Sequence, residues 1–105
     1  MNTETLQINI ESPIATVTLN RPNVLNAFNE QLVLDLQQAF KNLAEDESVR
    51  IIILTGSGKG FSAGADLTER EASWDPDRPS KDALLRGYMP IFNDIVEMPK
   101  IVIAA

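Results

Sequence analysis

The residues whose types and spacing could do chemistry lie in a glycine-rich loop, residues 56–60, and in the segment that follows it, residues 61–67. Neither stretch offers a histidine or a cysteine, because the 105-residue chain contains none of either. The commonest general base, the commonest zinc ligands and any disulfide within the chain are therefore excluded.

Two nucleotide-binding motifs can be tested against the glycine-rich loop, and both fail. The phosphate-binding P-loop needs a glycine five residues before Gly58 and a Ser or Thr directly after Lys59, but Ile53 and Gly60 stand there. The dinucleotide fingerprint needs its third glycine at the position of Phe61. The loop is therefore not expected to hold phosphates through either motif.

Ser62 stands in the pattern G-x-S-x-G, which is typical of the nucleophile elbow of a hydrolase. An elbow places its serine directly at the end of a strand, whereas the glycine-rich loop separates Ser62 from a strand that we expect to end near Thr55. The chain also has no histidine to activate the hydroxyl. A serine hydrolase is therefore the less favoured interpretation.

A third interpretation uses the backbone after Gly64. Glycine adopts conformations that other residues avoid, and it lets a ligand approach the peptide closely. We expect Ala65 to lie at the first turn of a helix over residues 67–71, where its N–H would have no partner within the helix. Such an N–H suits a carbonyl that is becoming an oxyanion. The alternative is a glycine-rich turn that only begins a helix.

The first half of the chain predicts a hairpin followed by an amphipathic helix. Apolar and polar residues alternate over residues 6–10, and a β-branched run over residues 14–19 follows the turn at Ser12-Pro13. Asn29 is a suitable N-cap for the next segment. Apolar residues then recur at helical spacing over residues 30–44, at Leu32, Leu36, Ala39, Phe40 and Leu43.

The second half of the chain predicts further strands and helices of an α/β protein. Residues 49–55 are almost continuously apolar, which is typical of a strand buried on both faces of a parallel sheet. Residues 73–81 contain two prolines and mixed charges, which indicates a surface excursion. We expect a helix over residues 82–96, kinked near Pro90, and a further buried strand over residues 101–105.

The chain stops inside that last apolar run, with no turn or polar tail after it. We therefore interpret residues 1–105 as the amino-terminal part of a single α/β domain, cut within a core strand. An edge strand that closes a small α/β domain is the alternative.

Composition narrows the classes of partner. The formal net charge of −6 argues against non-specific nucleic-acid binding, which needs a basic surface. No apolar run approaches the roughly 20 residues that span a bilayer, and the first ten residues lack the pattern of a signal peptide. We expect no membrane partner and a cytoplasmic location.

Four stretches, taken in order, resemble the enoyl-CoA hydratase/isomerase (crotonase) superfamily. They are Asn20-Arg21-Pro22, Leu25-Asn26-Ala27-Phe28-Asn29, the run VRIIILTGSGKGFSAGADL and the closing PKIVIAA. The ordered set covers nearly the whole chain, and it favours the backbone-donor interpretation over a simple glycine turn. One departure is Ile101, which stands where the family usually has proline.

The resemblance implies the ClpP/crotonase fold, an α/β architecture of repeated ββα units that binds acyl-CoA between its layers. It implies that the Ala65 N–H is one of two oxyanion-hole donors. It makes Asp66 an acceptor at a helix start rather than a proton carrier, and leaves Arg21 either a phosphate contact or a surface charge that holds its turn. The residues expected to contact the substrate are Leu25, Ala27, Ser62, Ala63, Gly64, Ala65, Asp66 and Leu67.

The resemblance also implies a mechanism. Two N–H groups would hold a thioester enolate while a carboxylate moves a proton or activates water, as in a lyase or isomerase of fatty acid metabolism. In the family, that carboxylate and the second donor follow the strand that begins at residue 101. Coenzyme A belongs to the substrate, so no separate cofactor is implied, and the full-length form would be a homotrimer or hexamer. The alternative is an inactive acyl-CoA binder, or a partner subunit of a full-length homologue.

Overall fold

The alternating residues at the start of the chain form a hairpin in the computed structural model, which describes residues 2–66 and 84–105. Strand β1 (Leu6–Glu11) pairs antiparallel with strand β2 (Ile14–Leu19) around the Ser12–Pro13 turn, whose peptide bond is cis. Leu6 lies opposite Leu19 in this register, and both side chains are fully buried. The predicted hairpin is confirmed.

Helix α1 (Glu30–Glu45) follows a short 3₁₀ turn, η1 (Pro22–Val24), and confirms the predicted amphipathic helix. Its first turn is capped by the Asn29 side chain, which accepts a hydrogen bond of 2.9 Å from Leu32 N–H. At its other end Lys100 donates to backbone carbonyls of the last turn and of the residue after the helix. A cation suits this end, where carbonyls lack partners within the helix.

The four strands form one mixed sheet in the order β1-β2-β3-β4. Strand β3 (Ile51–Gly56) runs parallel to β2, and strand β4 (Ile101–Ala104) runs parallel to β3. The fully buried Ile52 lies between Ala15 of β2 and Val102 of β4 in the register.

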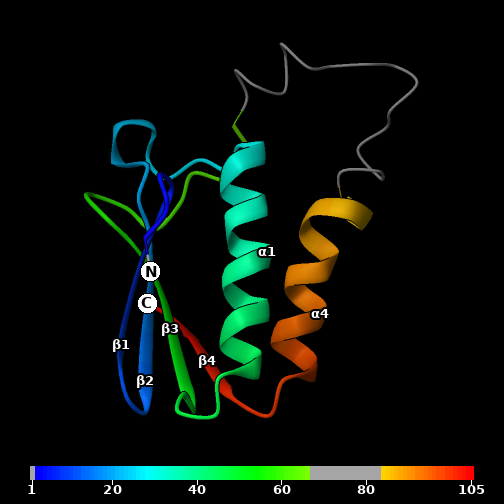
Figure 1. Ribbon diagram of the computed structural model, residues 1–105. Helices are drawn as coiled ribbons and strands as arrows, with labels where there is room; N and C mark the ends of the chain where they lie inside the picture. Colours follow the sequence, from blue (N-terminus) through cyan, green and yellow to red (C-terminus); the bar gives the residue numbers. More distant parts are fainter. Residues whose placement is uncertain (1, 67–83) are drawn as a thin grey trace.

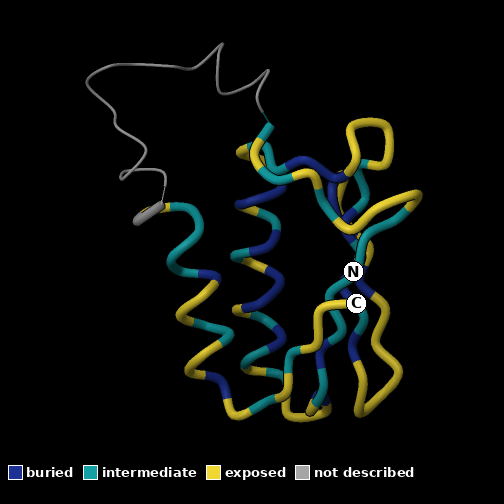
Figure 2. Tube along the Cα trace, turned by 180° about the vertical axis from the view of Figure 1, so that it is seen from behind, coloured by how far each residue is buried: buried dark blue, intermediate teal, exposed yellow. Residues whose placement is uncertain are grey.

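A second helical segment connects towards β4. A π-helical turn, η2 (Leu84–Tyr88), precedes helix α4 (Met89–Glu97). The irregular turn ends two residues before Pro90, near the position where the sequence predicts a kink. Helix α4 ends before Met98-Pro99, also as expected. Helices α1 and α4 lie side by side against the same face of the sheet (Figures 1 and 2).

The prediction that the later strands are buried on both faces is wrong for the described residues. Side chains that face α1 and α4, such as Ile52, are buried, but their neighbours on the other face are not. Ile101 and Ile103 are 62% and 46% exposed, and Ile51 and Ile53 are half-buried. A strand alternates its side chains between two faces, and the helices seen here cover only one of them.

The core lies between that covered face and the two helices. Its largest fully buried side chain is Phe40 of α1, which packs among apolar side chains of the sheet. None of the helices within residues 2–66 and 84–105 combines the length and apolar character needed to cross a bilayer. The predicted helix over residues 67–71 and the excursion over residues 73–81 lie outside the described residues.

Candidate functional site

Two loops meet at one end of the sheet because their strands end in register. Leu19, the last residue of β2, lies opposite Gly56, the last residue of β3. The first loop, residues 20–29, is called the Arg21 loop, and the second, residues 56–66, is called the glycine loop. Ser57 N–H donates to Leu19 O at 2.9 Å, so the loops remain in contact where they leave the sheet. The carboxyl ends of neighbouring parallel strands are a common place for a ligand site.

Further on, the two loops pair with each other as a short parallel ladder. Ala63 N–H donates to Leu25 O at 2.9 Å, and Phe28 N–H donates to Gly64 O at 2.7 Å. Asp66 N–H donates to Phe28 O at 2.9 Å, so Phe28 and Ala65 form an isolated parallel bridge. The ring of Phe28 also meets that of Tyr88 edge to face, with 6.0 Å between centroids.

This pairing corrects one expectation about Ala65. The residue lies in an extended bridge, not in the first turn of a helix. The sequence showed that the chain changes conformation after Gly64, but it could not show that Phe28, far away along the chain, would pair with this segment. The helix expected from Leu67 onward lies outside the described residues.

The bridge fixes the direction of the Ala65 N–H. In a planar trans peptide, the carbonyl of one residue and the N–H of the next point in opposite directions. Because Gly64 O accepts from Phe28, the Ala65 N–H of the same peptide unit points away from the Arg21 loop. Ala65 is exposed, and within the described part of the chain no acceptor takes its N–H. The peptide therefore presents one donor outward.

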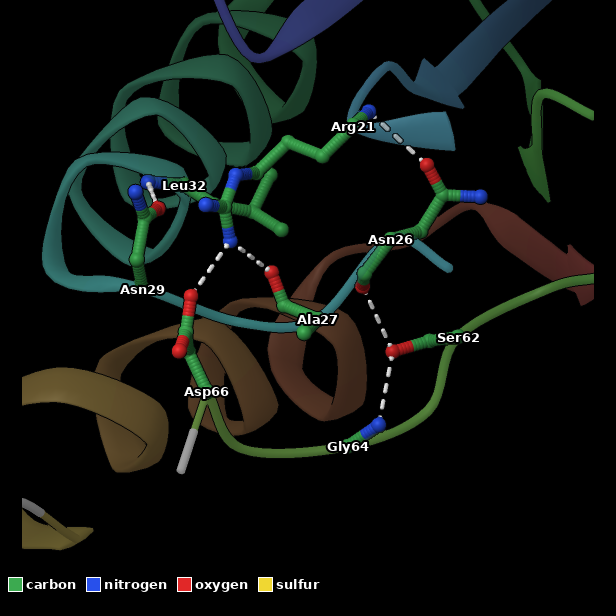
Figure 3. A network of polar contacts seen from close by, with 8 residues as sticks. All are labelled: Arg21, Asn26, Ala27, Asn29, Leu32, Ser62, Gly64 and Asp66. Atoms are coloured by element: carbon green, nitrogen blue, oxygen red, sulfur yellow. Dashed lines mark hydrogen bonds and ion pairs between the residues drawn. The ribbon is translucent and has the colours of Figure 1, made fainter. Parts of the chain in front are cut away.

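The conformation of Gly64 allows the Ala65 N–H to point outward. Its φ of 94° lies in the region that L side chains rarely adopt, and its N–H donates to Ser62 Oγ at 3.1 Å. Ser62 Oγ in turn donates to Asn26 O at 2.8 Å (Figure 3). The hydroxyl of Ser62 is thus part of the loop's internal bonding, and it lies well after the end of β3 at Gly56. The arrangement is not that of a nucleophile elbow.

Arg21 holds the outer ends of both loops. Its guanidinium donates to Ala27 O and pairs with the Asp66 carboxylate, with 3.1 Å between Nη1 and Oδ2 (Figure 3). These contacts hold the turn at Arg21, and a phosphate contact stays a prediction. Asp66 meets a cation here, and its expected role as an acceptor at a helix start stays a prediction.

The remaining expected contact residues differ in how exposed they are. Leu25 is exposed in a left-handed conformation, with φ of 53°, and Ala63 is exposed beside it in the ladder. Ala27 is buried, so its side chain faces the interior and its carbonyl is occupied by Arg21. Leu67 lies outside the described residues. Asn26, for which the sequence predicted no contact, lies between two expected contact residues and is fully buried.

A shallow hollow of about 320 Å³ lies near the Arg21 loop, lined by residues that include Glu4, Asn20, Arg21 and Asn29. Ala65 is not among the residues that line it. The outward donor and the hollow therefore lie on different parts of the surface.

This fold is found in solved structures of known class. The chain matches an enoyl-CoA hydratase/carnithine racemase from Magnetospirillum magneticum with a TM-score of 0.85 and 32% identity, over 98% of this chain and 39% of that one. It matches enoyl-CoA hydratase EchA8_6 from Mycobacterium marinum with a TM-score of 0.79 and 41% identity, over 96% of this chain and 47% of that one. The fold is therefore the crotonase fold, seen here in part.

Sequence comparison gives the family. The family model described as enoyl-CoA hydratase/isomerase matches residues 9–105. A 1,2-epoxyphenylacetyl-CoA isomerase of Escherichia coli is 38% identical over 99 residues, which are 91% of this chain and 37% of that protein. A probable mitochondrial enoyl-CoA hydratase of Dictyostelium discoideum is 40% identical over 92 residues, 88% of this chain and 31% of that protein. The chain belongs to the enoyl-CoA hydratase/isomerase family, and it spans well under half the length of these relatives.

Proposed function

We propose that this chain binds the thioester of an acyl-CoA and donates the Ala65 N–H to the thioester carbonyl oxygen. The observation that carries the proposal is the outward-pointing amide of an exposed residue, held by a peptide whose other side is bonded to Phe28. The names of the relatives, which are CoA-thioester hydratases and isomerases, support the class of ligand.

The chemistry follows from the position of the donor. A hydrogen bond to the carbonyl oxygen draws electrons from the α-carbon and the β-carbon, which acidifies the α-proton and favours attack at the β-carbon. Preorganised N–H donors of this kind are worth more to the transition state than to the ground state, and losing one costs roughly 3 kcal/mol of barrier. The family resemblance assigns the second donor and the catalytic carboxylate to positions after Ala105. The proposal for these 105 residues is therefore binding and polarisation, and coenzyme A enters as part of the substrate.

The test compares two ligands that differ at the carbonyl alone. Butyryl-CoA has the thioester oxygen, whereas S-butyl-CoA is a thioether of the same length without it. Calorimetry should show that the chain binds the thioester about five-fold more tightly, because one net hydrogen bond is worth about 1 kcal/mol. Ala65→Pro removes the N–H and should abolish this preference, and Ala65→Ser keeps the N–H and should retain it. Equal binding of both ligands by the unsubstituted chain would refute the proposal.

Assembly and activity of a longer form are separate predictions. The resemblance implies a homotrimer or hexamer for full-length members, and a hydratase or isomerase reaction. The inactive binder and the partner subunit remain the alternatives for the chain of 105 residues. Turnover of a 2-enoyl-CoA by these residues alone would show that they contain a catalytic group that the sequence does not reveal.

A further inference from the structure

Asn26 is the most unusual residue near the candidate donor. Its side chain is 0% exposed, although asparagine is usually a surface residue. Its backbone has φ of 54°, directly after Leu25 with φ of 53°. Two consecutive left-handed residues that are not glycine are strained, and such strain persists only where surrounding contacts hold it. The contacts of Asn26 must therefore be strong.

Every polar group of Asn26 has a partner. Its Oδ1 accepts from Arg21 N–H at 2.8 Å, and its Nδ2 donates to Ser57 O at 2.9 Å and to Gly60 O at 3.0 Å. Its backbone N–H donates to Arg21 O at 2.8 Å, and its backbone carbonyl accepts from Ser62. The side chain uses one acceptor and both amide hydrogens, which is the set that asparagine supplies and aspartate does not.

These contacts lead directly to the proposed donor. From Asn26 O the path passes through Ser62 Oγ to Gly64 N–H, the residue before Ala65 (Figure 3). The same side chain holds the first part of the glycine loop through Ser57 and Gly60. Asn26 thus bonds directly to Ser57, Gly60 and Ser62 of the loop that carries the Ala65 amide.

The glycine loop leaves room for this side chain at Gly56. A Cβ on Gly56 would lie 2.3 Å from Phe61 O, 2.6 Å from Gly60 O and 2.8 Å from Asn26 Nδ2. Such contacts are far closer than van der Waals distance, so the loop and the amide could not both keep their places. The position of the Asn26 amide therefore requires a glycine at residue 56.

We propose that Asn26 is a positioning residue, whose buried side-chain amide holds the glycine loop so that the Ala65 N–H is aimed at the ligand. The ligand part of this inference rests on the proposed function, whereas the geometric part stands on the contacts of Asn26 alone. Asn26 does not touch the reacting atoms; it acts through Ser62 and Gly64.

The test uses Asn26→Asp, which has the same shape but cannot donate to Ser57 O and Gly60 O. Asn9→Asp is the matched control, because Asn9 is exposed on β1 and undergoes the same change of charge. Ser62→Ala is a milder second variant. It removes the hydroxyl that joins Asn26 O to Gly64 N–H and leaves the core unchanged. Two measurements are made on the chain: residual dipolar couplings of backbone amides, and the preference for butyryl-CoA over S-butyl-CoA.

In Asn26→Asp we expect the couplings of Gly64, Ala65 and Asp66 to change while those of α1 stay as they were. The thioester preference should fall from about five-fold to about one, with thioether binding kept within about two-fold. Ser62→Ala should shift the Gly64 and Ala65 couplings in the same direction by a smaller amount, and Asn9→Asp should change neither measurement. If Asn26→Asp unfolds the chain, Ser62→Ala decides the question.

The measurements distinguish a failure of the proposed function from a failure of the positioning role of Asn26. If the unsubstituted chain shows no thioester preference, the proposed function is wrong, and the couplings still test whether Asn26 orients the amide. If the preference exists and survives in the Asn26 and Ser62 variants, the proposed function stands and the positioning role is overturned. Unchanged couplings at Gly64 and Ala65 in both variants would overturn it as well.

Discussion

Of two glycines in the same loop, Gly64 is favoured by its backbone conformation and Gly60 is not. Gly64 has φ of 94°, a conformation that a side chain makes unfavourable, although a Cβ there would meet nothing within 4 Å. Gly60 has neither constraint, because no positive φ and no neighbour within 4 Å are found for it. Backbone conformation alone therefore distinguishes the two positions.

Gly64→Ala should destabilise the chain by about 1 kcal/mol, because alanine in the left-handed region costs that much relative to glycine. It should also lower the thioester preference, since relieving the strain turns the peptide that carries the Ala65 N–H. Gly60→Ala is the matched control, and should be neutral or stabilise slightly by reducing the entropy of the unfolded chain. Urea denaturation measures the first effect and calorimetry the second. Equal stability of the two variants would contradict this account.

The roles of single residues differ in how well the sequence predicts them. Ala65 could be named from the glycine before it and from the family resemblance. Asn26 could not, because its role depends on carbonyls at Ser57 and Gly60 that are brought near it by the parallel pairing of β2 and β3. The available signal was local: an asparagine between apolar residues, which tolerates the left-handed conformation better than most residue types.

Among the elements, β1 and α1 are joined by a polar contact as well as by the core. Thr5, buried just before β1, donates from Oγ1 to Asp35 Oδ2 at 2.6 Å, and Gln31 donates to the other oxygen at 2.9 Å. Partial burial alone would raise the pKa of Asp35, but hydrogen bonds from Thr5, Gln31 and Thr3 outweigh it, and the pKa lies below its ordinary value. The ionised carboxylate is therefore favoured in the folded chain.

The direction of this shift fixes its pH dependence. Because the pKa of Asp35 is lower in the folded chain, the contact contributes stability above the unfolded pKa, about 3.9, and loses it as pH falls through the folded value. Thr5→Val keeps the shape and removes the donor, so it should destabilise by about 1 kcal/mol at pH 7. The difference between variant and parent should shrink below pH ~4. Thr16→Val, on the half-buried face of β2, is the control and should show no such pH dependence. A difference that is constant from pH 7 to pH 2 would refute the assignment.

Elements with a single buried face were predictable, and elements with two apolar faces were not. The spacing from Leu32 to Leu43 matches one stripe of α1, and the alternation in β1 matches one face of the sheet, so each pattern allows one packing. Residues 51–54 of β3 and all residues of β4 are apolar, and such a run fits burial on either face or both. Which face is covered depends on where α1 and α4 pack, and that is a property of the assembled layers.

At the scale of the whole molecule, residues 2–66 and 84–105 form a sheet with one covered face and one face that these residues leave open. On the open face lie Ile51, Ile53, Ile101 and Ile103, which the strand register places side by side, and we call these four residues the isoleucine face. Within the described residues β4 pairs only with β3, so its other edge also carries unpaired backbone groups. Exposed apolar patches beside an unpaired edge are a usual origin of self-association.

We therefore expect the chain to self-associate, and the double variant Ile101→Thr/Ile103→Thr to reduce it. Threonine keeps the β-branched shape that suits a strand, and both side chains point away from the core, so the melting temperature should change little. Val102→Thr is the matched control on the same strand, because Val102 packs against the core; it should lower the melting temperature and leave association as strong as before. Sedimentation velocity over a concentration series measures the association. A monodisperse parent chain, or a double variant that associates as strongly as the parent, would show that the isoleucine face does not drive it.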